Sequence, residues 1–595
     1  MKYPEKVHYD FQYRAPIDLG SDEVECKNIL MIGSCLSNVL LLSFKNFLST
    51  QARAPNIDHI LINNVAPLPS SPPRPIEDYS FQIIQLPLRG IMPESLYFSL
   101  AYQESQAYKN AFEKSLQLLE LFLDQALDYH KKYSLTTFVT NFLVPQQNSM
   151  GRLFPKYDLR NMAYFVEELN RHLSETIFKK NNIYLTDINE IATTFGRRYI
   201  QDDVLHTSNH GSIATDFDFA FDLRRLEKPI RFSKQHLLNT HGFIDAITHE
   251  IITQYKIVAG HNSIKIVICD LDDTLWRGVL AEDGIHLVEL EGWPLGLLEA
   301  LLVLKKRGIL LAIASKNEES LIIQQWDKVF KGHLKLEDFA IRKINWKEKA
   351  ENIAAILKEV NLLPRHALFI DDNPVEREQV QRTFPEIRTL GANLYSIRKI
   401  LLWAPELQIA HITEESSRRT ELVQAQSARQ ELSKKMSREE FLASLELKIE
   451  PFKINVIDHS DFARALELLN KTNQFNTTGQ QWRVQECDAF FKQQGLFYAF
   501  KVSDKFTPYG LVGLVVVQGN HLVQVVMSCR VVGLDIEKAM LAHVIMQATA
   551  PIITADFRET ESNFLCREFL ADFGFSKKEN VWRYKRTHLN FMPKN

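Results

Sequence analysis

Apolar and amphipathic runs alternate most clearly between residues 261 and 400. Continuous apolar strands separated by helix-period segments are typical of a parallel sheet that is covered on both faces. In such sheets, ligands bind beyond the carboxyl ends of the strands. The predicted strands are 264–269, 309–314, 339–344 and 367–370, and the predicted helices are 295–306, 318–330 and 348–360.

The N-terminal segment also mixes strands and helices. A strand-like run at 29–33 is followed by an amphipathic helix over 104–130, a strand stopped by Pro145, and a helix at 160–180. A further strand, NIYLTD, comes after that helix. This alternation predicts a second α/β domain.

The C-terminal third follows a different pattern. Residues 413–441 are charged and helix-favouring, with no strand, which predicts a helical linker. Beyond it, a helix at 461–470 precedes three β-rich runs and another helix, which predicts an α+β domain. The predicted domains are therefore 1–258 (α/β), 259–405 (central parallel sheet), 406–445 (linker) and 446–595 (α+β).

Composition narrows the functional class. The chain has 595 residues and a formal net charge of -3, so it lacks the basic field of a dedicated nucleic-acid binder. Its six cysteines contain no CxxC pair, which fits a reducing compartment. The first residues contain no apolar signal core, and the apolar runs are too short for a membrane span. We expect a cytoplasmic protein.

Candidate chemistry first appears after the strand 264–269, in the motif ICDLDDTLW. Asp270 and Asp272 stand two residues apart, so both can reach a phosphate-plus-metal site if the backbone curls there. One carboxylate can attack phosphorus while the other donates or accepts a proton. Such all-oxygen ligands suit Mg²⁺.

Partner residues follow at the ends of later strands. Ser315 in LAIASKN can hydrogen-bond a phosphate oxygen, and Lys349 in NWKEKAEN can neutralise developing charge. Asp371 and Asp372 in LFIDDNP can supply the remaining metal carboxylate. Acids can also merely cap strands and helices, but four motifs in this order favour a catalytic site.

These motifs resemble the haloacid dehalogenase (HAD) superfamily of aspartate-nucleophile phosphotransferases. The resemblance implies a Rossmann-like central domain with Asp270 as nucleophile and Asp272 as general acid/base. It implies that Ser315, Lys349 and Thr274 bind phosphate. It further implies a Mg²⁺ site formed by Asp270, Asp272, Asp371 and Asp372. The chain between Asp270 and Ser315 holds no separate cap domain, which predicts an open site for a large or carrier-bound substrate.

The resemblance narrows to the FkbH-like subfamily. DLDDTLWRGVLAEDG, INWKEKAENI and FIDDNPVERE carry it, together with the C-terminal NKTNQFNTTG, YGLVGLVVV and MSCRVVGLDIE. It implies that the protein dephosphorylates a phosphorylated C3 acid of glycerate type and loads the acyl group on a phosphopantetheinylated acyl carrier protein. Polyketide biosynthesis is the typical setting, and the C-terminal part is similar to the GNAT acyltransferase fold.

Two departures from these patterns concern acyl transfer. Polyketide-pathway members often have Cys inside the first motif, where this chain has Leu271. Strand alternation points the adjacent Cys269 to the opposite side, and Cys529 is another candidate acyl carrier. In the GNAT pantetheine loop, Arg530 and Gly533 are kept, whereas Asp535 could crowd and repel a pyrophosphate.

The N-terminal domain resembles SGNH-type hydrolases more weakly. Ser34 follows a strand in MIGSCLSN, Asn141 follows another strand, and Asp203 with His206 forms a DxxH pair. The resemblance implies a nucleophile, an oxyanion donor and a base, with His210 as a rival base. Gly-Ser is also a common turn after a strand, and the first block reads GSC rather than GDS.

Three functions compete at this point. The first is an FkbH-like enzyme that dephosphorylates a phosphorylated substrate and loads a carrier protein. The second is a plain Mg²⁺-dependent phosphatase acting on a small or carrier-linked phosphate. The third is a carrier-docking module without turnover. The acids and Lys349 oppose the third, because each would be a needless desolvated charge. The NKTNQFN segment could serve docking in all three.

Overall fold

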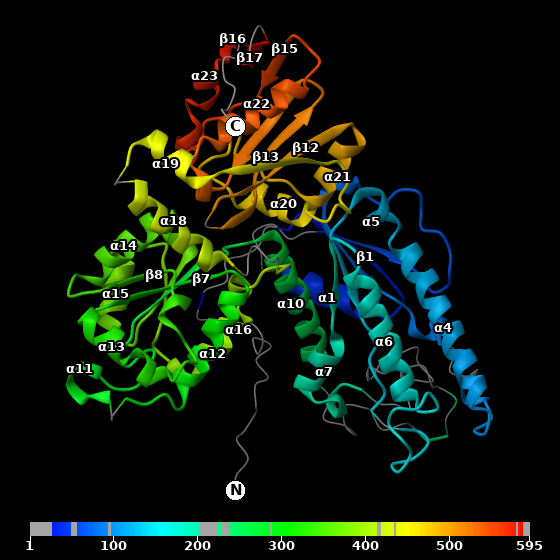
Figure 1. The fold of residues 1–595 in the computed structure, drawn as a ribbon. Coiled ribbons are helices and arrows are strands. Elements are labelled where there is room, and N and C mark those ends of the chain that lie inside the picture. Colours follow the sequence, from blue (N-terminus) through cyan, green and yellow to red (C-terminus); the bar gives the residue numbers. More distant parts are fainter. Residues whose placement is uncertain are drawn as a thin grey trace. The chain divides into compact units, whose positions relative to one another are not determined.

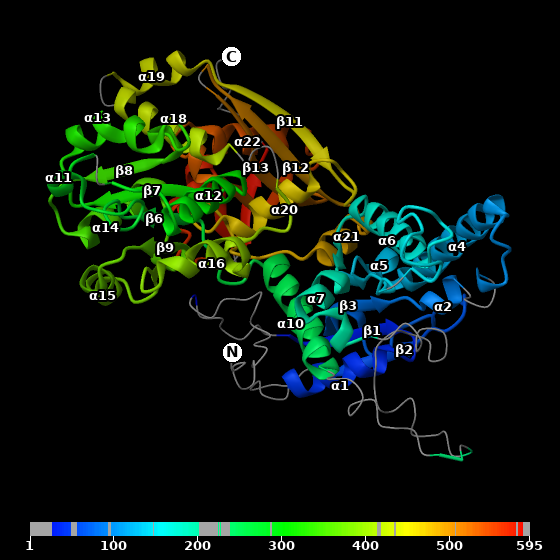
Figure 2. The ribbon, with the colours of Figure 1, turned by 90° about the horizontal axis from the view of Figure 1, so that it is seen from below.

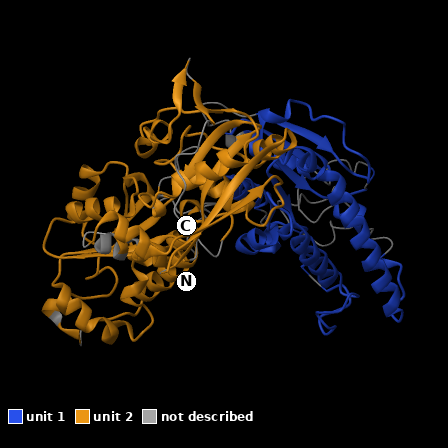
Figure 3. Cartoon of the chain, turned by 45° about the horizontal axis from the view of Figure 1, so that its top comes forward, with its two compact units in different colours: residues 1–14, 22–255 blue, residues 15–21, 256–595 orange. Residues whose placement is uncertain are grey.

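The protein is described by a computed structural model that forms two compact units. Unit 1 comprises residues 1–14 and 22–255, and unit 2 comprises 15–21 and 256–595 (Figure 3). The described residues are 19, 26–48, 56–92, 97–146, 148–201, 224, 226–227, 239–285, 288–412, 418–433, 436–505, 507–578 and 581–586.

Unit 1 is built on a five-stranded parallel sheet with the order β2-β1-β3-β4-β5. Its strands are β1 (Asn28–Gly33), β2 (Ile57–Leu61), β3 (Tyr79–Gln85), β4 (Thr137–Thr140) and β5 (Ile183–Thr186). Its helices are α1 (Ser37–Leu48), α2 (Leu88–Ile91), α4 (Ser105–Ala126), α5 (Asp128–Tyr133), α6 (Met162–Phe178), α7 (Ile188–Phe195) and α10 (Thr240–Ala259). The apolar run before Pro145 forms a strand only up to Thr140.

Both faces of this sheet are covered by helices. Leu30, Ile84 and Val139 pack in one core with buried residues of α4 and α6. On the other face, the Phe81 ring contacts Tyr255 of α10, with ring centroids 4.8 Å apart. Alternate residues of each strand therefore face different helices, as the near-continuous apolar runs predict.

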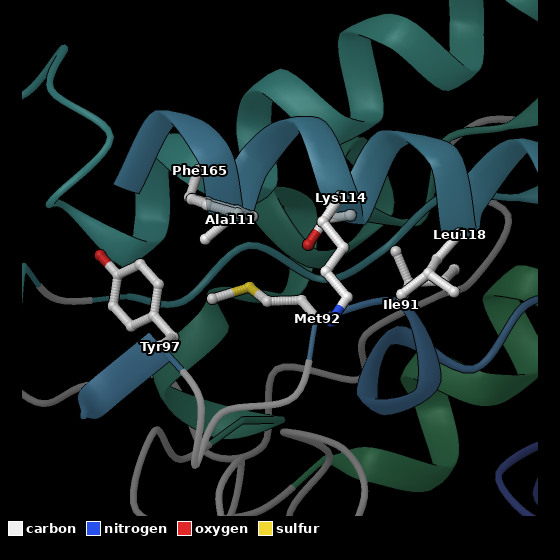
Figure 4. Close-up of a pocket in the computed structure, with 8 residues that line it drawn as sticks. Ile91, Met92, Tyr97, Ala111, Lys114, Leu118 and Phe165 are labelled. Carbon is white, nitrogen blue, oxygen red and sulfur yellow. The ribbon is translucent and has the colours of Figure 1, made fainter. Parts of the chain in front are cut away.

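A small apolar pocket lies beside α4 in unit 1 (Figure 4). Its lining residues come from α2, α4, α6 and the turn near Tyr97: Ile91, Met92, Tyr97, Ala111, Lys114, Ser115, Leu118 and Phe165. None of the residues that the sequence singles out for chemistry belongs to this lining.

A five-stranded parallel sheet with the order β10-β9-β6-β7-β8 forms the centre of the first part of unit 2 (Figures 1 and 2). Its strands are β6 (Ile266–Cys269), β7 (Leu310–Ser315), β8 (Ile341–Ile344), β9 (Ala367–Ile370) and β10 (Arg388–Leu390). Its helices are α11 (Leu280–Asp283), α12 (Trp293–Lys306), α13 (Glu319–Phe330), α14 (Lys349–Val360), α15 (Pro374–Thr383) and α16 (Ile397–Trp403).

The two faces of the central sheet pack against different helices. Val267 and Ile313 share a core with α12, α13 and α16, whereas Ile268 and Ala312 share one with α14 and α15. The chain runs from β6 through β7 to β8 on one side and through β9 to β10 on the other. The strand order therefore reverses beside β6, the position where open α/β sheets bind ligands.

The C-terminal part of unit 2 holds a seven-stranded mixed sheet, β11-β12-β13-β14-β15-β17-β16. Only β14 and β15 pair in parallel among these strands. The strands are β11 (Lys448–Ile454), β12 (Gly495–Ser503), β13 (Pro508–Gln518), β14 (His521–Met527), β15 (Ile552–Ala555), β16 (Ser576–Lys578) and β17 (Val581–Lys585). The helices are α20 (Phe462–Lys471), α21 (Val484–Lys492), α22 (Ile536–Gln547) and α23 (Phe569–Phe573).

The predicted linker contains two helices, α18 (Arg419–Ser433) and α19 (Arg438–Leu445). It is more than a spacer. Val423 packs into the core that α14 and α15 share with the central sheet. The buried Arg429 guanidinium lies 3.5 Å from Asp504 Oδ2 and 4.6 Å from the Tyr509 ring centroid in the C-terminal part. Helix α18 therefore packs against both parts of unit 2.

The predicted fold class, a multidomain α/β protein with a central parallel Rossmann-like sheet, is confirmed. The predicted domain boundaries stay predictions, since unit 2 holds the central sheet, the linker and the mixed sheet together. Among the described helices, none has the length and apolar character needed to cross a bilayer.

We expect His366, which directly precedes β9, to make the folded chain less stable as the pH falls. Its Nδ1–H donates to the Ser263 carbonyl at 2.8 Å, and burial with nearby Lys265 lowers its pKa to about 4. The folded chain therefore keeps His366 neutral, whereas the unfolded residue protonates near pH ~6.5. Its contribution to stability is complete above that pH and is lost as the pH falls towards 4.

His366→Asn should therefore flatten the fall in melting temperature between pH 6.5 and 4, measured by thermal unfolding at several pH values. The matched control is His333→Asn, at an exposed histidine of the same domain, which should keep the wild-type slope. Equal slopes for all three proteins would contradict the assignment.

Candidate functional site

The carboxyl ends of the central strands bring the predicted acids and Lys349 together. Asp270 follows β6, Asp371 and Asp372 follow β9, and Lys349 is the first residue of α14, which follows β8. The Asp270 amide donates to the Ile370 carbonyl at 2.9 Å, which fixes the start of one acidic loop against the other. The four motifs therefore converge at one edge of the sheet.

Lys349 is the centre of this cluster. Its Nζ donates to Asp270 Oδ2 at 2.6 Å and also to Asp371 Oδ2. The lysine is 4% exposed and Asp371 0% exposed, so these charges are largely withdrawn from water. One buried ammonium thus links two carboxylates that would otherwise repel each other.

Three carboxylates form a candidate cation site. Oxygen atoms of Asp270, Asp371 and Asp372 lie within 4.8 Å of one another. The donor set consists of oxygen atoms, which Mg²⁺ prefers. The Asp272 carboxylate, which the sequence predicts as a fourth metal ligand, is not in this group and is held elsewhere.

The electrostatics fit a site that needs a further positive charge. Burial and the neighbouring Asp270 raise the pKa of Asp371 to about 6. Burial also raises the pKa of Asp270, against the opposing effects of Lys349 and Ser315. The single lysine thus leaves the negative charge of the cluster incompletely balanced, and a divalent cation would favour both ionised carboxylates.

Thr274 and Arg377 hold the loop after β9. The Thr274 hydroxyl donates to Asp372 Oδ1 at 3.1 Å and accepts from the Asp372 amide at 3.0 Å. Arg377 donates to the carbonyls of Asp371 and Asp372 at 2.7 Å each. A Cβ at Gly391 would lie 1.7 Å from the Asp371 carbonyl oxygen, so only glycine allows β10 to end this close. Thr274 therefore positions Asp372, and its hydroxyl is already engaged.

Lys316 links three loops of the site. It follows Ser315, and its Nζ donates to Glu376 at 2.9 Å and to Glu348 at 3.3 Å. Glu348 directly precedes Lys349, and Glu376 lies in the first turn of α15. This ion-pair network, which the sequence reading did not identify, joins the loops after β7, β8 and β9.

Asp272 accepts hydrogen bonds from three residues that the sequence analysis did not identify. The Trp276 indole and the Leu280 amide donate to Oδ1 at 2.9 and 3.0 Å. The Asn317 amide donates to Oδ2 at 2.8 Å and contacts Ser315 Oγ at 3.1 Å. Asn317 stands two residues after Ser315 in the SKN motif, which was the available signal.

The esterase prediction in unit 1 is only partly described. Ser34 Oγ donates to Gln85 Oε1 at 2.6 Å, so its proton is directed to an amide oxygen. The Asn141 side chain donates to Asp187 at 2.8 Å and accepts from the Ile188 amide at 2.9 Å. Both of its ends are therefore used within the fold. Asp203, His206 and the rival His210 lie outside the described residues.

Of the two cysteines considered for acyl transfer, Cys269 faces the core, as strand alternation predicts, and Cys529 stays a prediction. Cys269 is completely buried in the core that faces α12, and this burial raises the pKa of its thiol. A buried thiol with a raised pKa is a poor nucleophile. The side chain of Cys529 lies outside the described residues.

The predicted pantetheine loop leads into helix α22, which begins with two acids, Asp535 and Glu537. Arg530 Nε donates to Ser528 Oγ at 3.0 Å, and Gly533 has a φ of 86°. Asp535 precedes the first turn of α22 and pairs with Arg438 at 3.0 Å, and Glu537 follows inside that turn. Lys538 also pairs with Asp535, at 3.2 Å, so the charge of this acid is balanced by two cations and the use of the loop by a pyrophosphate stays a prediction.

The NTTG portion of the NKTNQFNTTG motif packs into the mixed sheet. Strands β14 and β15 pair only at His521–Leu522 with Thr554–Ala555, and beyond them Phe475 and Thr477 bond the edge of β14. The Thr477 amide donates to the Val525 carbonyl, and the Arg558 amide donates to the Thr477 carbonyl. Asn476 and Thr477 are each 1% exposed, so these two residues are a structural strap and present no docking surface.

Comparisons with known proteins leave the family of the chain open. No family model matches, and no curated protein matches. The N-terminal part of BF1531 from Bacteroides fragilis, which contains a phosphatase domain complexed with Mg, is 19% identical. It covers 64% of this chain and 94% of its own, with a TM-score of 0.43. The 3-deoxy-D-manno-octulosonate 8-phosphate phosphatase of Moraxella catarrhalis is 17% identical, covering 27% and 92%, with a TM-score of 0.18. The geometry of the cluster around Lys349 is therefore the basis for a function.

We expect Mg²⁺ to stabilise the protein through the three carboxylates. A cation at 100 times its Kd stabilises the folded chain by about 2.7 kcal/mol, which thermal unfolding with and without Mg²⁺ would show as a melting temperature higher by several degrees. Asp372→Asn should abolish this response, because it removes one ligand of the group. Glu318→Gln, at an exposed acid near the same edge, is the control and should respond like the wild type. A full response in Asp372→Asn would contradict the site.

Proposed function

We propose that the protein is a Mg²⁺-dependent phosphatase or phosphotransferase of HAD type, with Asp270 as its nucleophile. The observation that carries this proposal is the buried Lys349, which bonds both Asp270 and Asp371 beside the third carboxylate, Asp372. A salt bridge that only stabilised the fold would not need three acids and one lysine beside β6, where the order of the strands reverses. A phosphoryl group, which brings negative charge and needs a cation, does need them.

The first chemical step follows from this geometry. An oxygen of Asp270 attacks phosphorus, the bond from phosphorus to the leaving oxygen breaks, and Asp272 gives that oxygen its proton. Lys349 keeps Asp270 ionised and oriented. Ser315, 1% exposed at the end of β7, hydrogen-bonds Asp270 in the resting site and offers its hydroxyl to a phosphoryl oxygen.

The second step returns the enzyme to its starting state. Water attacks the phosphorus of the aspartyl phosphate, the bond between phosphorus and the Asp270 oxygen breaks, phosphate leaves, and Asp272 takes up the proton that the water loses. Asp270, Asp371 and Asp372 would hold Mg²⁺, which would supply positive charge for the phosphoryl oxygens. Thr274 and Arg377 keep the loop of Asp372 in place throughout.

The finer proposal is transfer of an acyl group of glycerate type to an acyl carrier protein. One support is the FkbH-like resemblance of the motifs. The other is the short connection between Asp270 and Ser315, whose described helices are α11 and α12. The strap at Thr477 occupies the edge of β14, which argues against entry of a pantetheine arm into the mixed sheet in the GNAT manner. We therefore assign the carrier's delivery route to the central sheet edge.

Asp270→Asn should abolish phosphate release, with kcat falling at least a thousandfold while the fold persists. The amide cannot serve as the nucleophile that forms the aspartyl phosphate. Phosphate release from a panel of phosphate esters and acyl phosphates, with Mg²⁺ present, measures it. The control is Asp273→Asn, at the neighbouring acid whose carboxylate accepts from the Gly278 amide. Appreciable turnover by Asp270→Asn would refute the nucleophile assignment.

Carrier loading has a separate expected outcome. Candidate carrier proteins incubated with the enzyme, Mg²⁺ and 1,3-bisphosphoglycerate should gain the mass of a glyceryl group, measured by intact-mass spectrometry. The gain should vanish with Asp270→Asn. Phosphate release with unmodified carriers would reject the loading step and leave the phosphatase.

A further inference from the structure

The carboxylate of Asp272 is held by three hydrogen-bond donors from two different loops. Trp276 and Leu280 lie in the loop that leaves Asp272 itself, and both donate to Oδ1. Asn317 comes from the loop after β7, 45 positions along the chain, and donates to Oδ2. The two oxygens therefore have different environments, because one has two donors and the other has one.

The different donors of the two oxygens indicate which of them lies on the side of the proposed phosphoryl site. Oδ1 is held by a fully buried indole and a backbone amide. Oδ2 has a single described donor, Asn317, whose amide nitrogen also lies 3.1 Å from the hydroxyl of Ser315. Oδ2 is thus the oxygen beside the residue expected to contact the phosphoryl group. Asn317 sets its direction.

We propose that Asn317 is a positioning residue that aims Asp272 Oδ2 at the leaving oxygen during phosphoryl transfer, with Trp276 fixing the other oxygen. This inference rests on the proposed function, since it assigns a role within that same reaction. In the step concerned, the Asp270–phosphorus bond forms, the bond to the leaving oxygen breaks, and the proton passes from Asp272 to that oxygen.

The surroundings of both positioning groups suit this role. Asn317 is 3% exposed and lies next to Lys316, whose ion pairs with Glu376 and Glu348 hold the loop. Trp276 is 1% exposed and packs against Trp326, with ring centroids 6.3 Å apart. A hydrogen bond from a rigid, buried donor orients its acceptor more strictly than one from a mobile surface group.

The expected effect depends on the leaving group. General acid catalysis contributes roughly 10²–10⁴-fold when the leaving oxygen needs a proton, and far less when it departs readily as an anion. Loss of Asn317 should therefore slow the hydrolysis of a poor leaving group selectively. A merely structural loss would slow both kinds of substrate by the same factor.

The test compares p-nitrophenyl phosphate with phenyl phosphate, two esters of similar size whose leaving groups differ. The full chain with Mg²⁺ is assayed for kcat/KM, which includes the phosphoryl-transfer step. Asn317→Ala should lower kcat/KM for phenyl phosphate at least tenfold more than for p-nitrophenyl phosphate. Trp276→Phe, which removes the other side-chain donor but keeps an aromatic ring, should shift the ratio in the same direction.

The matched control is Asn352→Ala. Asn352 is also 3% exposed, lies in the same domain and bonds Asn345 through its amide, but has no described contact with Asp272. It should change both rates by the same factor. In an Asp272→Asn background, Asn317→Ala should add no further selectivity, because it acts through Asp272. An unchanged ratio in Asn317→Ala, or added selectivity in the double variant, would overturn the proposal.

A crystal structure of Asn317→Ala supplies a readout that does not depend on turnover. The Asp272 carboxylate should rotate from its wild-type orientation, and an unmoved carboxylate would refute the positioning role. Failure of the proposed function looks different: the wild type would then release no phosphate from any substrate, and Asp270→Asn would be indistinguishable from it. In that case the crystal structure would show only whether Asn317 orients the Asp272 carboxylate, and the role in phosphoryl transfer would fall with the proposed function.

Discussion

The buried contact of Lys349 with Asp270 and Asp371 is the constraint on which the site depends. Placing these charges away from water is costly unless each is paired, and removing one partner of such a buried pair typically costs about 3–5 kcal/mol. The pairing therefore couples stability to chemistry. The Lys349 ammonium reaches both acids because helix α14 starts at Lys349 and because strands β6 and β9 end in register with each other. The sheet provides this arrangement, since β6 and β9 are adjacent parallel strands whose carboxyl ends lie at the same edge.

The surrounding interactions keep this arrangement rigid. Lys316 ties the loops that carry Ser315, Lys349 and the β9 acids, and Arg377 fixes the backbone of Asp371 and Asp372. The Lys316 ion pairs join residues on different loops, so a shift in one loop is opposed by the others, whereas Arg377 ties the β9 loop to the helix that follows it. Preorganisation of this kind lets charged groups stabilise a phosphoryl group without rearranging during the reaction. It also explains why a cluster with raised carboxyl pKa values is retained in a folded protein.

The central site was predictable because its signals are local. A short apolar run followed by an acid marks two strand ends, and with the Ser315 and Lys349 motifs in order these signals indicate both the sheet and the edge at which the acids gather. The partners of Asp272 were not predictable in the same way. Asn317 meets Asp272 only through the pairing of β6 with β7, and Trp276 reads as an ordinary core residue. The linker was underestimated for a related reason, because the few apolar residues of α18, such as Val423, become meaningful only once the sheet face they cover is known.

The mixed sheet shows that part of the predicted docking segment is used to complete the fold, while the docking role of the segment stays a prediction. The Asn-rich segment around Asn476 has the polar composition of a binding loop, yet its amides are used inside the domain. Gln524 donates to Asn476 Oδ1 at 2.7 Å, and Asn563 donates to the Asn476 carbonyl at 2.9 Å. Buried polar groups must find partners, and here they find them by completing the edge of β14 where β15 diverges. A ligand that bonded this edge as an added strand would first have to displace Phe475 and Thr477. The same hydrogen bonds that complete the domain therefore also occupy this edge of β14.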